Sequence, residues 1–404
     1  VIYESPSNYN LDIVFRNRKE KINGLDIAYH IDYNTRLQEI KASQNPFLWF
    51  KCFNQEKYTI ERKIQFDDSL LKEKVMSFSE LDPENMTEPQ NPAIVLNDDN
   101  QVVAVEGDQG TLIKEPEKVY ELIKNAVSRG EKKIVIEDEG FYAEPKYSLE
   151  SKRIQKCLRT CNNIAGLNIT YYYADKRFSL EPSDLFDTVI ISDNYATEVD
   201  KTRIKYILHK FSSKYDTYGK SRRFKRHTNK YMDIDDADYG WKINVDEESE
   251  NLYDDIIHRR NVSRTPAFES EAFCYGDDGD DIGNFYAEVD IAEQHMFVYM
   301  DGRRILDSDV VTGCVGAGHS TPGGIYQIDY KQTPAVLRGE DYESKVTYWM
   351  PFNGGIGFHD ATWRGSFGGE IYKYSGSHGC VNMPFSKAQE LFGIVEEGMP
   401  VIVY

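Results

Sequence analysis

Residues 375–384 read SGSHGCVNMP, and this stretch says more about fold and chemistry than any other part of the 404-residue chain. Its cysteine, Cys380, follows a glycine and lies 21 residues after a second histidine, His359. A thiol is a strong nucleophile as the thiolate, and an imidazole within hydrogen-bond reach can generate that thiolate at neutral pH. The intervening segment is rich in glycine and aromatic residues, which suits a loop that brings its two ends together. The pattern therefore indicates a Cys/His acyl-transfer site.

The neighbours of these two residues suit the same chemistry. Gly379 would let the backbone approach a reacting carbonyl closely and aim amide N–H groups at it. Asp360 follows His359 directly, and its carbonyl or carboxylate could fix the imidazole tautomer. On these residues alone, a buried core pair of Cys380 and His359 remains open as an alternative.

A metal site is the second alternative at this place. Four residues could in principle bind zinc: His319, His359, His378 and Cys380. The spacing His378-x-Cys380 is poor for a structural zinc site, and neither CxxC nor HExxH occurs in the chain. We therefore expect no metal and no cofactor.

Length and charge bound the remaining possibilities. A chain of 404 residues is too long for one ordinary core, so two or three domains are expected. The net charge of −19 argues against a nucleic-acid partner, because phosphate binding needs clustered Lys and Arg.

The sequence shows neither a signal peptide nor a long apolar run, and it begins at Val1. We expect a processed or truncated form that lacks an N-terminal membrane anchor. The six cysteines are scattered, and Cys157 and Cys161 are expected to be free core thiols.

Three regions and a connection follow from composition and periodicity, giving a multidomain chain. Two α+β modules at residues 1–140 and 141–262 precede an acidic linker at 263–283. The last region, 284–404, is mainly β with one or two short helices. The carboxylates of the linker and the basic run at residues 220–226 are both expected to be solvated, the latter on a hairpin edge.

Three helices have clear boundary signals. One begins at Pro116 and ends at Gly130, and a second is capped by Asp200. A third, near the C-terminus, is predicted to be capped by Ser386 and closed by Gly398.

Four separated blocks together resemble the L,D-transpeptidase catalytic domain of the YkuD type. They are Thr312-Gly313, residues 321–326 (TPGGIY), residues 348–360 (YWMPFNGGIGFHD) and residues 375–384. The family signature is a histidine, a spacer, then Ser-His-Gly-Cys, a hydrophobic residue and Arg or Asn. Here Asn382 takes the last position, as in the Firmicute branch. Upstream, residues 22–27 and 239–243 are similar to the peptidoglycan-binding modules of Gram-positive enzymes, although a spacer role is equally open.

The resemblance implies a cysteine peptidoglycan transpeptidase outside the membrane, in the cell wall. Cys380 matches the nucleophile, His359 the general base and His378 the invariant second histidine. The Asp360 carbonyl would orient the base, and the N–H groups of Gly379 and Cys380 would line the oxyanion hole. Five residues are expected to contact substrate: Trp363, Ser377, Asn382, Phe358 and Tyr348.

The implied partners are peptidoglycan stem peptides, as donor and acceptor, and carbapenem-type inhibitors that mimic the donor. A tetrapeptide stem would lose its terminal D-alanine, and an acceptor amine would complete a 3→3 cross-link. Two alternatives remain: a hydrolase, either an L,D-carboxypeptidase or a cysteine endopeptidase, and a non-catalytic wall-binding protein.

Overall fold

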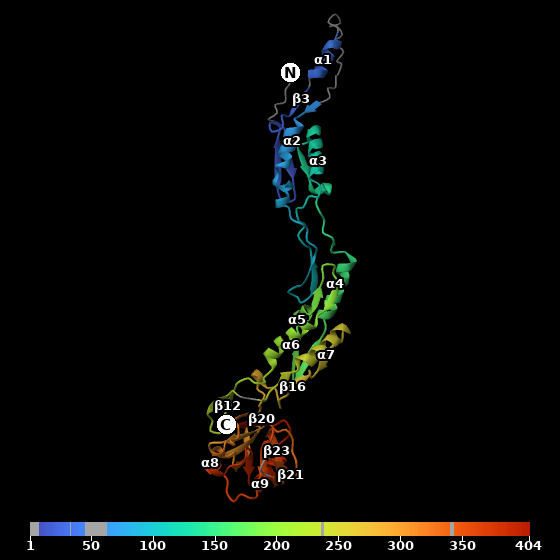
Figure 1. The fold of residues 1–404 in the computed structure, drawn as a ribbon. Helices are drawn as coiled ribbons and strands as arrows, with labels where there is room; N and C mark the ends of the chain where they lie inside the picture. Colours follow the sequence, from blue (N-terminus) through green and yellow to red (C-terminus); the bar gives the residue numbers. More distant parts are fainter. Residues whose placement is uncertain (1–7, 33, 45–62, 236–237, 340–342) are drawn as a thin grey trace. The chain divides into compact units, whose positions relative to one another are not determined.

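The computed structural model describes residues 8–32, 34–44, 63–235, 238–339 and 343–404 (Figure 1). Two compact units make up the chain: Val1–Asn97 with Val103–Leu158, and Asp98–Val102 with Arg159–Tyr404. Helices and strands mix in the N-terminal part, whereas strands dominate the C-terminal part. This confirms the expected multidomain α+β and mainly-β fold class. In the part of the chain that the structure covers, no helix combines the length and apolar character needed to span a bilayer.

The first unit is built on a small sheet in the order β2-β1-β7, in which β1 is antiparallel to β2 and parallel to β7. The apolar face of α3 contributes Val119, Ile123 and Val127 to the core of this unit. The elements of this unit and of the hairpin that follows it are β1 (Asn10–Val14), β2 (Lys19–Asn23), β3 (His30–Asp32), α1 (Asn34–Ser43), β4 (Lys63–Gln65), α2 (Asp68–Met76), β5 (Ala93–Leu96), β6 (Val102–Val105), α3 (Pro116–Arg129) and β7 (Lys133–Val135).

A mixed module begins the second unit, with a sheet in the order β15-β8-β9 and three short antiparallel pairs. Helices α6 and α7 pack against one another. Its elements are α4 (Lys152–Ala165), β8 (Ile169–Tyr173), β9 (Lys176–Ser179), α5 (Pro182–Asp187), β10 (Val189–Ile191), β11 (Thr197–Val199), α6 (Lys201–Tyr215), β12 (Arg222–Lys225), β13 (Tyr231–Ile234), β14 (Lys242–Ile243), α7 (Val245–Ile257), β15 (Val262–Arg264) and β16 (Phe268–Ser270).

The C-terminal part contains a five-stranded sheet in the order β19-β18-β17-β26-β20 and a three-stranded sheet in the order β23-β24-β25. Apolar side chains from both sheets and from α9 share one core. The elements are β17 (Tyr286–Asp290), β18 (His295–Met300), β19 (Arg303–Asp309), β20 (Gly324–Gln327), β21 (Ala335–Arg338), β22 (Glu343–Val346), β23 (Trp349–Asn353), β24 (Ile356–Asp360), α8 (Ile371–Ser375), β25 (Val381–Met383), α9 (Phe385–Ile394) and β26 (Pro400–Val403).

The boundary signals of two of the three predicted helices are confirmed. Gly130 ends α3 in the left-handed conformation at φ +68°, and the Asp200 carboxylate accepts a hydrogen bond from the Thr202 N–H at the start of α6. The prediction for α9 is wrong at both ends. Pro384, rather than Ser386, is its N-cap residue, and it ends at Ile394 because Val395 is already extended.

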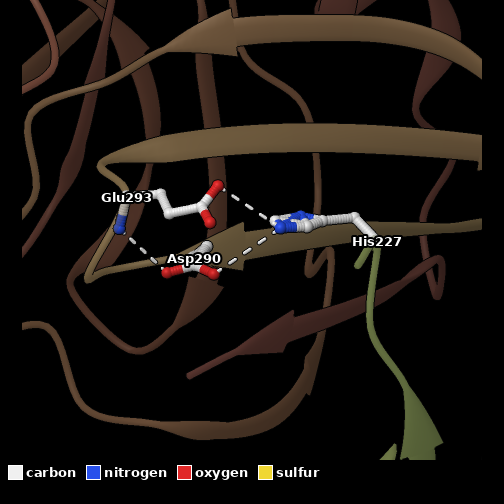
Figure 2. A group of neighbouring side chains, drawn as sticks. All are labelled: His227, Asp290 and Glu293. Atoms are coloured by element: carbon white, nitrogen blue, oxygen red, sulfur yellow. Dashed lines mark hydrogen bonds and ion pairs between the residues drawn. The ribbon is translucent and has the colours of Figure 1, made fainter. Parts of the chain in front are cut away.

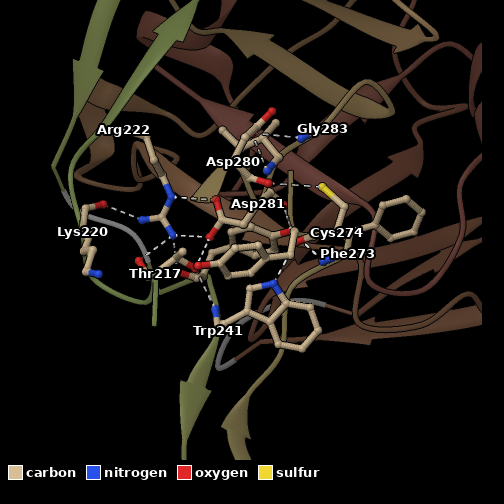
Figure 3. A network of polar contacts seen from close by, with 12 residues as sticks. Thr217, Lys220, Arg222, Trp241, Phe273, Cys274, Asp280, Asp281 and Gly283 are labelled. Carbon is tan, nitrogen blue, oxygen red and sulfur yellow. Dashed lines mark hydrogen bonds and ion pairs between the residues drawn. The ribbon is translucent and has the colours of Figure 1, made fainter. Parts of the chain in front are cut away.

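The acidic segment and the basic hairpin meet in a buried polar network, which corrects the expectation that both are solvated (Figure 3). The Asp281 carboxylate, 1% exposed, accepts hydrogen bonds from Arg222 Nε at 3.0 Å, Arg222 Nη2 at 2.5 Å and Thr217 Oγ1 at 2.5 Å. The Tyr239 hydroxyl donates to the Asp281 carbonyl at 2.7 Å. The hairpin itself is present as predicted, since β12 pairs with β13. Two of its arginines, Arg222 and Arg226, pair with buried carboxylates because those charges need compensation.

The cysteines follow the expectation of free thiols where the structure describes them. Cys157 and Cys161 are buried on α4 and unbridged, as predicted. Cys52 lies outside the described residues.

Candidate active site

Strand pairing brings the predicted nucleophile and base together. β24 runs parallel to β25 with His359 opposite Asn382, and Cys380 directly precedes β25. On its other side β24 pairs with β23, where Trp349 lies opposite His359. A cavity of about 210 Å³ opens at this place. Ten residues line it: Leu337, Ser344, His359, Trp363, Arg364, Gly376, Ser377, His378, Cys380 and Asn382.

The Cys380 thiol is 6% exposed, and its Sγ lies 3.5 Å from the Gly355 carbonyl oxygen, to which it can donate. Burial raises the pKa of Cys380 to about 11, against an opposing hydrogen bond from the Gly357 backbone. Removing this thiol from water disfavours the thiolate more than one N–H group favours it. The thiol is therefore protonated at neutral pH and needs a base to become a nucleophile.

His359 has the properties of such a base. Its side chain is 4% exposed, and its Nδ1 lies 2.9 Å from the Asp360 carbonyl oxygen. A carbonyl can only accept, so Nδ1 carries the proton and Nε2 is left with its lone pair. Burial lowers the pKa of His359 and outweighs the Asp360 carbonyl, which acts in the opposite direction. The imidazole is thus neutral at pH 7, with Nε2 able to accept a proton.

Asp360 uses its two oxygen types separately. While its carbonyl faces His359, its carboxylate Oδ1 accepts hydrogen bonds from the backbone N–H groups of Thr347 at 2.7 Å and Tyr348 at 2.8 Å. The carboxylate is thereby committed to the start of β23. Of the two possibilities the sequence left open, the carbonyl is the group that contacts the imidazole.

The turn before Cys380 is fixed by side-chain hydrogen bonds. Ser377 Oγ accepts from the Gly379 N–H at 3.0 Å and donates to the Cys380 carbonyl at 2.6 Å. Thr321 Oγ1 donates to the Gly379 carbonyl at 2.6 Å. Gly379 has φ +122°, which L side chains rarely adopt. Because the Gly379 N–H donates to Ser377, it is not available as one of the two expected oxyanion-hole donors in this structure. The Ser377 hydroxyl makes its hydrogen bonds to the backbone of this turn.

Two of the five expected substrate contacts are not among the described residues that line the cavity. Phe358 is fully buried in the core, because side chains alternate along β24 and His359 faces the opposite side. Tyr348 packs on Phe385 and Phe392, with ring centroids 5.6 and 5.2 Å away, and it is not among the described residues that line the cavity.

The other expected contacts lie at the cavity. Trp363 is 52% exposed and its ring centroid is 5.9 Å from that of His359. Asn382 is 2% exposed, and its Oδ1 is buried with no hydrogen-bond partner among the described residues. His378 lines the cavity and packs edge-on against His319 at 4.7 Å between centroids. Within the described ranges, these histidines and Cys380 do not form a three-ligand group of the kind that holds a metal.

Four of the lining residues were not predicted as site residues: Leu337, Ser344, Arg364 and Gly376. Arg364 Nη1 donates to the Ser375 carbonyl at 2.7 Å, and burial lowers the pKa of its guanidinium. A signal for it existed, since Arg364 is the one cationic residue between positions 361 and 372.

Comparisons with known proteins agree with this geometry. Residues 284–403 match the family model of the L,D-transpeptidase catalytic domain, and residues 184–262 match the model described as "Putative peptidoglycan binding domain". No curated protein sequence matches the chain at a significant level.

Two solved structures are similar to the chain over 62% of its length. A cysteine-to-serine mutant of the Enterococcus faecium L,D-transpeptidase is 32% identical, with a TM-score of 0.50, and the match covers 62% of this chain and 100% of that one. The avibactam carbamoyl enzyme of Ldtfm is 33% identical, with a TM-score of 0.50 and coverage of 62% and 98%. The chain therefore belongs to the L,D-transpeptidase family of cysteine acyltransferases.

Proposed function

We propose that the chain forms 3→3 cross-links between peptidoglycan stem peptides through a thioester on Cys380. The observation that carries this is the shared cavity of Cys380 and His359, with the His359 Nδ1 proton held by the Asp360 carbonyl. A nucleophile, a base and a group that orients the base are the three parts that acyl transfer by a thiol requires.

In the first step, Sγ of Cys380 attacks the carbonyl of the third residue of a tetrapeptide stem. His359 Nε2 accepts the thiol proton during the attack, because the raised pKa of the thiol and the lowered pKa of the imidazole keep both groups neutral beforehand. When the tetrahedral intermediate collapses, the peptide C–N bond breaks. The same proton passes to the departing D-alanine nitrogen, which leaves a thioester.

In the second step, the amine of another stem attacks the thioester. His359 takes a proton from this amine and returns it to the leaving sulfur, so Cys380 is regenerated as a thiol. With the Gly379 N–H held by Ser377, we assign the Cys380 N–H to the developing oxyanion.

Three cavity residues fit a peptide substrate. The exposed Trp363 ring offers an apolar surface, and the unpartnered Asn382 Oδ1 can accept from a substrate N–H. Arg364 supplies a positive charge beside the same cavity, where a stem carboxylate can bind.

The upstream part places this chemistry at its substrate. We assign peptidoglycan binding to the module at 141–262, within which residues 184–262 match the corresponding family, and a spacer or binding role to residues 1–140. With the catalytic domain at 284–404, this arrangement locates the protein in the cell wall. One of the similar structures is described as the avibactam carbamoyl enzyme of Ldtfm, and we propose by analogy that carbapenem-type inhibitors acylate Cys380.

The test compares Cys380→Ala with Cys314→Ala, a matched control that removes a second buried thiol near the same turn. Intact mass after carbapenem treatment should show one adduct on the wild type and on Cys314→Ala, and none on Cys380→Ala. Incubation with a disaccharide-tetrapeptide should yield a cross-linked dimer with the same dependence on Cys380. An adduct that survives Cys380→Ala would contradict the mechanism, whereas trimmed monomers without dimer would make the chain a hydrolase.

A further inference from the structure

A second polar cluster lies away from the catalytic cavity, where the hairpin of the upstream module meets the catalytic sheet (Figure 2). His227 comes from the turn between β12 and β13. Asp290 is the last residue of β17, and Glu293 lies in the turn between β17 and β18. The three side chains point toward one another from two segments that are more than 60 residues apart in sequence.

The distances within this cluster are those of a ligand set. His227 Nε2 lies 3.3 Å from Glu293 Oε2 and 3.9 Å from Asp290 Oδ2. One donor atom from each residue lies within 4.8 Å of the other two, and no other group of three such residues occurs in the described ranges. Ligands around a tetrahedral zinc ion at about 2.0–2.1 Å are about 3.3–3.4 Å apart. The His227–Glu293 pair already has this spacing, whereas Asp290 would have to move closer to His227.

Burial makes the charge of this cluster costly. Asp290 and the neighbouring Glu288 are fully buried, while Glu293 is half-exposed. Among the described residues, Arg226 is the permanent cation paired with this group, through Nη2 to Asp290 Oδ2 at 2.5 Å. The two buried carboxylates, Asp290 and Glu288, face one guanidinium, which leaves one excess buried negative charge, and the half-exposed Glu293 adds a second at the surface when the imidazole is neutral. Such an excess inside a protein calls for a positive partner, and a divalent cation supplies the missing charge.

Among the described residues, the polar contacts of the His227 ring are the ion pairs of its Nε2 with Glu293 and Asp290. The His227 side chain is 8% exposed, its Nδ1 has no partner in the described part of the chain, and its ring edge packs on Phe297 at 4.4 Å between centroids. Its backbone N–H donates to Glu288 Oε1 at 2.8 Å, while Glu288 Oε2 is buried and unpartnered. This nine-tenths-buried ring therefore has its Nε2 fixed between two carboxylates.

We propose that His227, Asp290 and Glu293 bind a zinc-type divalent cation, with an open coordination position on the solvent side of Glu293. One imidazole nitrogen with two carboxylate oxygens is a donor set that zinc accepts, whereas calcium and magnesium prefer oxygen ligands throughout. Arg226 keeps its hydrogen bond to Asp290 as an outer partner of the ligand. The bound ion ties the β12–β13 hairpin to the catalytic sheet, and this inference does not depend on the transfer reaction.

The test measures zinc binding to the full chain in a Cys380→Ala background, which removes the catalytic thiol as a competing ligand. After chelator treatment, titration calorimetry should give one zinc ion per chain. His227→Gln and Glu293→Gln should each weaken binding at least tenfold, and His258→Gln, an exposed histidine elsewhere, should not. Magnesium and calcium should not displace the zinc, and anomalous scattering from zinc-soaked crystals should peak between the three side chains.

Because Glu293 is half-exposed, Glu293→Gln should have the same Tm as the Cys380→Ala protein in metal-free buffer. Weaker zinc binding by this variant would then not be caused by a loss of folding. Absence of zinc binding, or binding that both variants leave unchanged, would overturn the proposal. The proposal would also fail if acid pH, but not zinc, stabilised the contact between the β12–β13 hairpin and the catalytic sheet. A protonated His227 would then supply the positive charge.

Discussion

The Arg222→Met substitution tests whether buried electrostatics hold the hairpin against the acidic segment. Arg222 donates two hydrogen bonds to Asp281 and one each to the carbonyls of Lys220, Thr217 and Tyr239 (Figure 3). Removing it leaves the Asp281 carboxylate, 1% exposed, with the Thr217 hydroxyl as its remaining side-chain donor. Breaking a buried ion pair in this way costs about 3–5 kcal/mol. Since the Arg222 side chain is 11% exposed and water can partly replace it, we expect about 3 kcal/mol.

Thermal unfolding provides the assay. For a unit of this size, about 3 kcal/mol lowers Tm by about 6–12 °C. Arg223→Met is the matched control: the next residue on β12 is exposed over the Tyr231 ring, and its loss should change stability by less than about 0.5 kcal/mol. In a double-mutant cycle with Asp281→Asn, most of the Arg222 effect should disappear. Equal destabilisation by the two arginine variants, or additive effects of Arg222→Met and Asp281→Asn, would refute the reasoning.

Three further predictions concern Cys380, His359 and Gly379. Because burial raises the pKa of Cys380 to about 11, its alkylation by iodoacetamide should rise about tenfold per pH unit between pH 7 and 10; a plateau below pH 8 would instead indicate a thiolate–imidazolium pair. Burial holds the pKa of His359 below its ordinary value, so the base stays neutral and transpeptidation should persist at pH 6; loss of activity with a midpoint above pH 6.5 would contradict this. Gly379→Ala puts a side chain at φ +122° with its Cβ 3.1 Å from Ile356 Cδ1, and kcat should fall at least tenfold. Gly365→Ala, whose Cβ meets open space, should retain kcat.

Local signals predicted the fold where a residue's own conformation decides the outcome. Gly130 ends α3 because it adopts positive φ at little cost, and Asp200 begins α6 because its carboxylate satisfies a free N–H group. The prediction that Ser386 is the N-cap of α9 was wrong, although serine is a good N-cap residue. Pro384 already has a φ suited to the start of a helix, so α9 begins at Phe385, before Ser386. The capping propensity of Ser386 therefore does not decide where α9 begins, because β25 ends at Met383 and fixes the direction of the chain just before it.

The predicted site residues that line the cavity all lie in one short segment of the chain, from His359 to Asn382. Cys380 and His359 announce themselves by type and spacing, but which face of β24 meets solvent depends on the packing of two sheets, so Phe358 was assigned to the wrong side. Proximity across the fold is still harder to foresee. His227 and Asp290 carry no shared motif, since they meet only when the hairpin lies against the catalytic sheet.

Asp360 explains how a thiol with a raised pKa can remain selective and still react. Because burial raises the pKa of Cys380 to about 11, the thiol is protonated at pH 7 and offers little thiolate to stray electrophiles. In the proposed mechanism, reaction then requires a bound acyl donor and a His359 imidazole that is oriented toward the Cys380 thiol. The Asp360 carbonyl fixes the ring of His359, and its carboxylate anchors the backbone of Thr347 and Tyr348 at the start of β23. One residue therefore joins the orientation of the base to the strand beside it, and disturbance of that strand should misalign the base before it disturbs the nucleophile.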